Sequence, residues 1–191
     1  MLYTLVMKNN AHESESKEHR LKRLQDGHPI EAIETLLNSI DNYFNNEIRL
    51  TVGQAQTTLL FLGVHAVALT IAEVFFGQGG PEGYKWFLEK YVDGDTNDTK
   101  FSQVAEVLHD WRNILAHQWI GSLGHDIIYD YQTELGWERR DRSLAINPRI
   151  YYEQYIAAFS AGGKLWRYDK MFTEQELEEI KDRIVEKYKR R

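Results

Sequence analysis

The apolar positions between residues 30 and 48 recur every three or four residues, which is the period of an amphipathic helix. Pro29 follows the turn at residues 26–28 and suits the first turn of this helix. The pattern therefore predicts a helix with one buried face. The apolar residues are Ile33, Leu36, Leu37, Ile40, Tyr43, Phe44 and Ile48.

A second stretch, from about residue 52 to 76, is apolar on nearly every side and ends at the glycine-rich turn 77–81. Its part from Leu59 to Phe76 is long enough to raise the question of a transmembrane helix. It contains His65 and Glu73 and lacks flanking Lys or Arg anchors, and both features count against a membrane span. We therefore predict a central helix covered by its neighbours in a bundle, and no membrane partner.

Further helical patterns complete the chain. They cover about residues 82–91, 100–119, the stretch after Pro148, and a last stretch that opens with a capping-box sequence at Thr173–Glu176. Residues 1–27 are predicted to form a polar N-terminal arm, whose part from about Glu13 to Gln25 is either a solvated helix or a loose segment. We expect one mainly α-helical domain over residues 1–191, with two helices at its C-terminal end.

The segment 126–147 has a different period. Apolar and aromatic residues alternate with others along it, on both sides of Leu135-Gly136-Trp137. This alternation is typical of strands, so we predict a β-hairpin inserted into the helical domain. The alternating residues are Ile127, Tyr129, Tyr131, Leu144 and Ile146.

Composition restricts the chemistry. Cysteine is absent, which excludes disulfides, thiolate nucleophiles and cysteine-ligated zinc. The seven histidines form no His-Glu-x-x-His pattern or comparable ligand set, so we expect no metal and no cofactor. The apolar stretch in residues 1–8 is too short for a signal peptide and has no basic region before it, which predicts a cytoplasmic protein.

The net charge of −6 argues against broad, sequence-blind binding of nucleic acid, so any such contact must be local. Arg139, Arg140 and Arg142 cluster in the predicted hairpin, beside Tyr131 and Trp137. Arginine and aromatic side chains together can bind phosphates and stack on bases. A solvated hairpin is the alternative, because Glu138 and Asp141 dilute the positive charge.

The helix predicted over residues 100–119 carries the candidate chemistry. Helical spacing gathers Asp110, Asn113 and His117 into one polar row. Arg112 lies at the border of the apolar face, next to Ala105 and Ala116, whose small side chains would let another helix or subunit approach. The core face is predicted to hold Val104, Val107, Leu108, Trp111, Ile114 and Leu115.

The phrase Arg112-Asn113-Ile114-Leu115-Ala116-His117 resembles the Arg-polar-x(4–6)-His motif of the HEPN superfamily. The resemblance covers about residues 30–118. It implies a helical bundle that dimerises so that two motifs face each other. Many members are metal-independent ribonucleases, often toxins or phage-defence proteins, and others have lost activity and serve as binding modules. A second match, Arg23 to His28, has leucine after the arginine and runs into a turn.

The resemblance implies an endoribonuclease whose catalytic residues are Arg112, Asn113 and His117. His117 would act as base or acid on the RNA substrate, Arg112 would bind the phosphate, and Asn113 would orient His117 or the phosphate. The site would be shared by a homodimer. The products would carry 2′,3′-cyclic phosphate and 5′-hydroxyl ends.

Three residues are supporting candidates: His109, Asp110 and Glu73. His109 and Asp110 flank the motif on its polar side and are either solvated or part of a dimer cleft. Glu73, a carboxylate in the most apolar helix, is expected to pair with Arg112 or His65, or else to act as a catalytic acid.

Two other functional classes stay open. One is a catalytically silent interaction or regulatory module on the same bundle, which pairs with itself or with another protein such as an antitoxin. In this reading Arg112 has a structural role. The other is a small-ligand binder that uses the Trp-rich and Tyr-rich surfaces.

Overall fold

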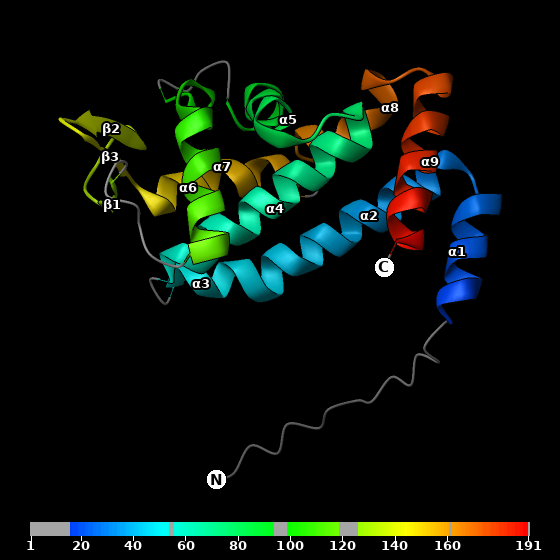
Figure 1. The fold of residues 1–191 in the computed structure, drawn as a ribbon. Coiled ribbons are helices and arrows are strands. Elements are labelled where there is room, and N and C mark those ends of the chain that lie inside the picture. Colours follow the sequence, from blue (N-terminus) through cyan, green and yellow to red (C-terminus); the bar gives the residue numbers. More distant parts are fainter. Residues whose placement is uncertain (1–15, 54–55, 94–98, 119–125, 161, 191) are drawn as a thin grey trace, which may run out of the picture.

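The computed structural model describes residues 16–53, 56–93, 99–118, 126–160 and 162–190, and the side chains of His117, Gln118 and Asp126 lie outside this description. The described chain is mainly helical, as predicted, and a small three-stranded sheet lies at one end of the helices (Figure 1). The main helices are α1 (Lys17–Asp26), α2 (Pro29–Tyr43), α3 (Arg49–Gly53), α4 (Thr57–Phe76), α5 (Gly80–Phe87), α6 (Ala105–Gln118), α7 (Pro148–Phe159), α8 (Tyr168–Met171) and α9 (Glu174–Lys189).

Short segments of other helical types join these helices. A π-helical segment, Phe44–Ile48, connects α2 to α3, and a second one, Leu88–Val92, extends α5. A 3₁₀ turn, Phe101–Val104, leads into α6, and another, Lys164–Arg167, precedes α8. The predicted C-terminal helices are present as α7 and α9, and α8 lies between them as an additional short helix.

Helix α4 is the centre of the molecule. It contacts α2's extension, α3, α5, α6, α7 and α9. Among the described residues it is the one helix that is long and apolar enough to cross a membrane, but 61% of its apolar stretch is buried inside the protein. This burial is the pattern of a core helix, as the sequence predicts.

The C-terminal end of α4 is closed by specific contacts. Gly77 has a φ of 68°, a left-handed conformation that glycine adopts without steric cost. The guanidinium of Arg183, on α9, donates hydrogen bonds of 2.6 and 3.2 Å to the carbonyl oxygens of Val74 and Phe75. These two carbonyls belong to the last turn and have no partner within the helix. The contact fixes α9 against the end of α4.

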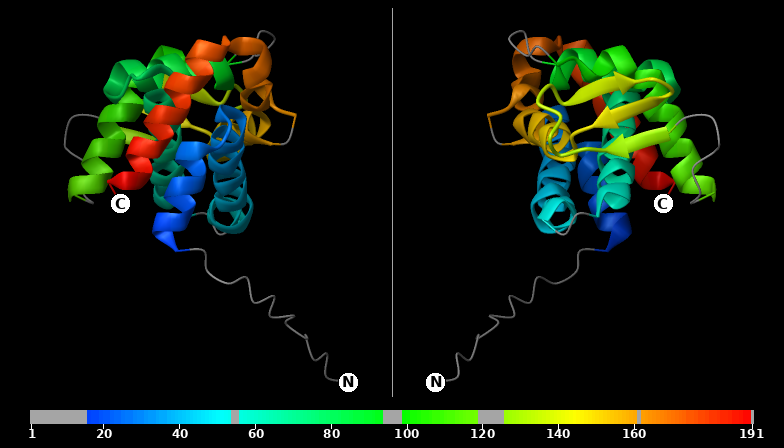
Figure 2. Two further views of the ribbon diagram at one scale, coloured as in Figure 1. Left: turned by 90° about the vertical axis from the view of Figure 1, so that its right-hand side faces the viewer. Right: turned by 90° about the vertical axis from the view of Figure 1, so that its left-hand side faces the viewer.

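The predicted polar arm over residues 1–27 contains a solvated helix where the structure describes it, which is one of the two forms expected for this segment. Residues 17–26 form helix α1, with Ser16 as its N-cap, and residues 1–15 lie outside the described residues. Most residues of α1 are exposed, whereas Leu24 is buried, and α1 packs beside α9 (Figures 1 and 2). A few apolar side chains are therefore enough to hold this helix on α9.

The sheet differs from the predicted hairpin. Its strands are β1 (Asp126–Tyr129), β2 (Trp137–Arg140) and β3 (Ser143–Ile146), in the order β1-β3-β2. The hairpin consists of β2 and β3 only, and its turn contains Asp141 with a φ of 47°. Strand β1 pairs with β3 in parallel, so Leu135–Trp137 leads into β2 and is not the hairpin turn.

The chain between β1 and β2 is held by side chains. The amide nitrogen of Asn147 donates to the carbonyl oxygens of Tyr131 and Thr133, both at 3.0 Å. Its amide oxygen accepts from the backbone of Arg149 and Ile150 and so caps α7. One buried asparagine therefore joins the sheet to the following helix, and strand alternation alone could not predict this contact.

Close packing of α2 and its extension against α4 depends on Gly63. A Cβ atom at this position would lie 2.2 Å from Cδ1 of Ile48 and 2.9 Å from the Tyr43 hydroxyl. We expect Gly63→Ala to lower the free energy of unfolding by about 1–3 kcal/mol through overpacking. Helix propensity alone predicts the opposite sign, a gain of about 1 kcal/mol. Urea unfolding of both proteins distinguishes the two, and a more stable variant would contradict the close approach.

Candidate functional site

Helix α6 holds Arg112 and Asn113 on consecutive positions, and both side chains are half-buried. Nη1 of Arg112 donates a hydrogen bond of 2.9 Å to Oδ1 of Asn113. Nε of Arg112 is buried and has no hydrogen-bond partner. Among the residues that the structure describes, no carboxylate lies within 4.0 Å of the guanidinium nitrogens. Arg112 is therefore a partly desolvated cation without an anionic partner in the described part of the chain.

Two buried histidines lie next to this cation. His65 of α4 and His109 of α6 are joined by a hydrogen bond of 3.0 Å between Nε2 and Nδ1, and they are 1% and 8% exposed. Burial, His109 and the charge of Arg112 lower the pKa of His65 to about 2. Burial and Arg112 also lower the pKa of His109. Both rings are thus neutral near pH 7, and one nitrogen of the pair donates while the other accepts.

The histidine pair continues into a cluster of buried hydroxyls. The His65 ring lies 3.8 Å from the ring of Tyr84, centroid to centroid. The Tyr84 hydroxyl is 2.6 Å from that of Tyr151 and 3.1 Å from that of Tyr155. Burial raises the pKa of all three tyrosines, so they stay neutral. Side chains of α4, α5, α6 and α7 are therefore joined inside the apolar core by two groups of hydrogen bonds and by the ring contact between them.

His109 is buried, so the interpretation that it lies on a polar, solvated face of the helix is wrong. His109 lies about 60° around α6 from Arg112 and about 40° from Ala105, which is also buried. The crossing of α4 and α6 covers this part of the helix. His65, a polar residue in an apolar helix, is the feature of the sequence that indicates a buried partner, because a buried imidazole needs a hydrogen-bond partner.

The other supporting candidates lie elsewhere. Asp110 is exposed and lies about 160° around α6 from Arg112. Glu73 is half-exposed and forms an ion pair with Lys187 of α9. It follows His65 by eight residues, or about 12 Å along the helix axis. The expected pairing of Glu73 with Arg112 or His65 is therefore wrong, because α9 supplies a lysine at the solvent edge.

The backbone of His117 belongs to the last turn of α6, and its side chain lies outside the described residues. His117 follows Asn113 by four positions, which is the spacing of neighbours on one helix face. The structure thus brings Arg112, Asn113, His65 and His109 together, and the helical spacing adds His117 to the same end of α6.

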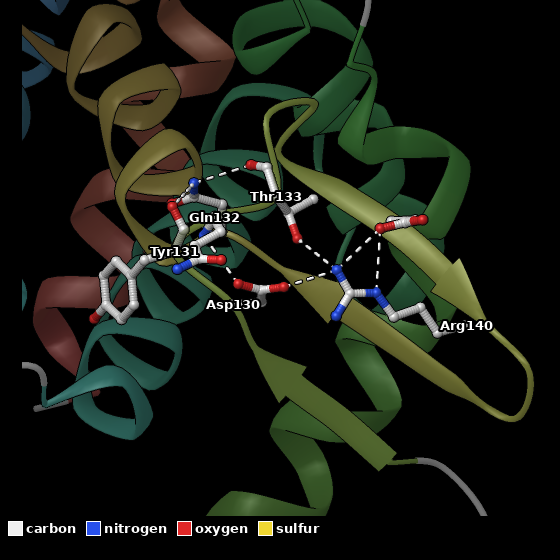
Figure 3. A network of polar contacts seen from close by, with 7 residues as sticks. Asp130, Tyr131, Gln132, Thr133 and Arg140 are labelled. Atoms are coloured by element: carbon white, nitrogen blue, oxygen red, sulfur yellow. Dashed lines mark hydrogen bonds and ion pairs between the residues drawn. The ribbon is translucent and has the colours of Figure 1, made fainter.

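The arginines of the sheet have different environments. Figure 3 shows the guanidinium of Arg140 beside the Asp130 carboxylate, and the structure gives it hydrogen bonds of 2.7 Å to Asp130 and 3.0 Å to Glu138. These partners raise the pKa of Arg140, and the backbone N–H of Gln132 together with Arg140 lowers the pKa of Asp130. Arg139, Arg140 and Arg142 are all exposed, and Arg140 is neutralised by two carboxylates of the sheet region.

No set of three or more His, Asp or Glu side chains within the described ranges has a geometry that could hold a metal ion. A comparison of the chain with protein-family models, with curated proteins and with solved structures found no match. The chemistry of the candidate site therefore has to be inferred from its own residues.

The neutral histidine pair predicts that the fold is sensitive to acid. Unfolded histidine binds a proton near pH 6.5, whereas folded His65 does so near pH 2. The contribution of His65 is therefore complete above pH 6.5 and falls with decreasing pH, by about 1.4 kcal/mol per pH unit. His65→Gln removes the titrating group but keeps a polar partner for His109. We expect the free energy of unfolding to decrease from pH 6 to pH 4.5 by about 2 kcal/mol less in this variant than in wild type. Urea unfolding at both pH values measures this, and equal losses would contradict the buried neutral pair.

Proposed function

We propose that this protein is a metal-independent endoribonuclease of the HEPN type, a toxin or phage-defence protein whose reaction uses Arg112, Asn113 and His117. The observation that carries the proposal is the state of Arg112. A partly buried cation is costly without an anion, and no carboxylate compensates this one in the described part of the chain. A phosphate group would supply the missing charge, since guanidinium binds two phosphate oxygens at once.

The surroundings of Arg112 suit this role. Asn113 accepts a hydrogen bond from Nη1, which holds the guanidinium in one orientation and leaves the amide nitrogen of Asn113 free to donate to a phosphate oxygen. The neutral histidines beneath it add no charge that would attract or repel the phosphate. Preorganised donors of this kind stabilise a transition state without reorganisation, typically by a factor of about 10²–10³ in rate per donor.

The acid–base steps fall to His117. The lowered pKa values of His65 and His109 make them unsuitable as general acids at neutral pH. His117 would remove the proton from the ribose 2′-hydroxyl, whose oxygen then attacks phosphorus. The P–O5′ bond breaks, and the leaving oxygen takes a proton from an acid. The products are a 2′,3′-cyclic phosphate and a 5′-hydroxyl.

A second copy of the chain would supply that acid. One chain offers one His117, and a two-fold arrangement of α6 would set two motifs against each other. Ala116 is exposed on the same side of α6 as Arg112, one turn further on, so a small side chain lies where the second copy would approach. The proposed active unit is a homodimer.

The proposal is tested by cleavage of a mixed RNA pool in EDTA, with mass-spectrometric identification of the product ends. We expect Arg112→Ala and His117→Ala each to lower the rate by at least about 100-fold. Arg167→Ala is the matched control, because Arg167 is exposed and precedes α8, at the other end of the bundle from α6 (Figure 1). Its rate should equal that of wild type. Products without cyclic phosphates, or cleavage that survives both motif substitutions, would contradict the proposal.

A catalytically silent interaction module is the second candidate. It is favoured by the neutralisation of Arg140 within the sheet and by the net charge of −6, which together leave few cations for an RNA strand. A module would bind a protein partner, such as an antitoxin, or a second copy through α6. Absence of wild-type cleavage, together with an Arg112-dependent dimer in analytical ultracentrifugation, would favour this candidate.

A further inference from the structure

An apolar groove lies between α2 and α4, and the last turn of α9 closes one end of it. Its volume is about 350 Å³, within the range of ligand pockets, roughly 300–1,000 Å³. A second hollow of about 310 Å³ shares Tyr43 and Ala66 with it and extends it toward Leu59. The groove is lined by Leu36, Ser39, Ile40, Tyr43, Ala66, Val67, Thr70, Lys187 and Tyr188.

Two of the polar groups at this groove are already used by the protein itself. The ammonium group of Lys187 is paired with Glu73. The Ser39 hydroxyl donates to the backbone carbonyl of Thr35 at 2.8 Å. The charged side chain that lines the groove is therefore neutralised, whereas Leu36, Ile40 and the methyl group of Ala66 offer apolar contacts. The chemistry of the groove favours an apolar occupant.

The chain itself leads to this groove. Helix α1 begins at Lys17, and the guanidinium of Arg20, one turn later, lies 5.9 Å from the ring centre of Tyr188, which lines the groove. Figures 1 and 2 both show the start of α1 beside the C-terminal end of α9. The described chain therefore begins close to the end of the groove that α9 closes.

The residues that precede Ser16 in the sequence contain an apolar segment at a suitable distance. Leu2, Tyr3, Leu5, Val6 and Met7 stand within six positions, and residues 8–15 form a polar spacer before Ser16. Eight extended residues span at most about 26–29 Å, and a flexible chain of this length spans about 15 Å on average. The apolar segment can thus reach the groove without any change in α1.

We propose that residues 2–7 of the same chain dock in the groove between α2 and α4. A tethered segment has an effective concentration in the millimolar range, which favours it over a second copy at micromolar concentration. Docking would remove from water the apolar side chains of the segment and the apolar walls of the groove. This inference is independent of the proposed reaction, because it involves neither α6 nor Arg112.

The absence of native cysteine allows a direct test by disulfide formation. The double variant Leu5→Cys/Thr70→Cys places one thiol in the segment and one in the groove wall. The matched control is Leu5→Cys/Glu186→Cys, because Glu186 is exposed on the same last turn of α9 but does not line the groove. Under mild oxidation we expect the groove pair to form an intramolecular disulfide at least about tenfold faster than the control pair, measured by mass spectrometry.

A groove-filling substitution completes the test. Ala66 is exposed in the groove, so Ala66→Phe fills the space without disturbing the core. Added to the variant Leu5→Cys/Thr70→Cys, Ala66→Phe should lower the rate of disulfide formation to that of the control pair and leave the circular dichroism spectrum unchanged. Equal rates of disulfide formation in the two pairs would overturn the proposal. A rate in the groove pair that Ala66→Phe leaves unchanged would also overturn it. Disulfide-linked dimers that increase with protein concentration would overturn it in favour of a second copy.

Discussion

The fold depends on the need to bury α4, a twenty-residue helix that is apolar on nearly every side. A helix of this kind has no solvent face of its own, so the other elements are arranged to cover it. Helices α2, α5, α6, α7 and α9 contact it, directly or through short extensions, and Arg183 binds the carbonyls at its end. Gly63 lets Ile48 and Tyr43 on the α2 side pack directly against the backbone of α4.

The one histidine within α4 then determines where the candidate site lies. A buried imidazole must find a hydrogen-bond partner, and His65 finds it in His109 of α6. This contact sets the position of α6 on α4, and Arg112 follows one turn after His109. Burial, together with the positive charge of Arg112, lowers the pKa of both histidines and keeps both rings neutral, so the rings add no charge beside the guanidinium. The same packing that stabilises the core therefore leaves a cation ready for an anionic ligand.

Much of the fold is predictable from residue periodicity, and the exceptions have physical causes. The ranges of α2, α4, α6, α7 and α9 follow from helical spacing and from end signals such as Gly77 and the capping box at Thr173. For α1, the sequence left a solvated helix and a loose arm as alternatives, because only two or three apolar side chains hold this helix on α9. The parallel pairing of β1 with β3 escaped because alternation shows that a segment is a strand but not which strand it pairs with.

The candidate site was only partly predictable for a similar reason. The pattern of α6 locates Arg112 and Asn113, but side-chain partners depend on tertiary contacts that have no local signature. Glu73 pairs with a lysine more than a hundred positions away, and His109 is buried by a helix forty positions earlier. Arg140 likewise finds its carboxylates only once the strands are paired.

We propose above all that the guanidinium of Arg112 binds a phosphate group of RNA. It is tested most directly by NMR of the arginine side-chain Nε–H and asparagine side-chain NH₂ signals during titration with an RNA that carries 2′-O-methyl groups and cannot be cleaved. We predict saturable shifts of the Arg112 and Asn113 signals, an RNA affinity that falls with added salt, and an unchanged Arg167 signal. Saturable RNA binding that shifts Arg139 and Arg142 but leaves Arg112 and Asn113 unchanged would contradict it.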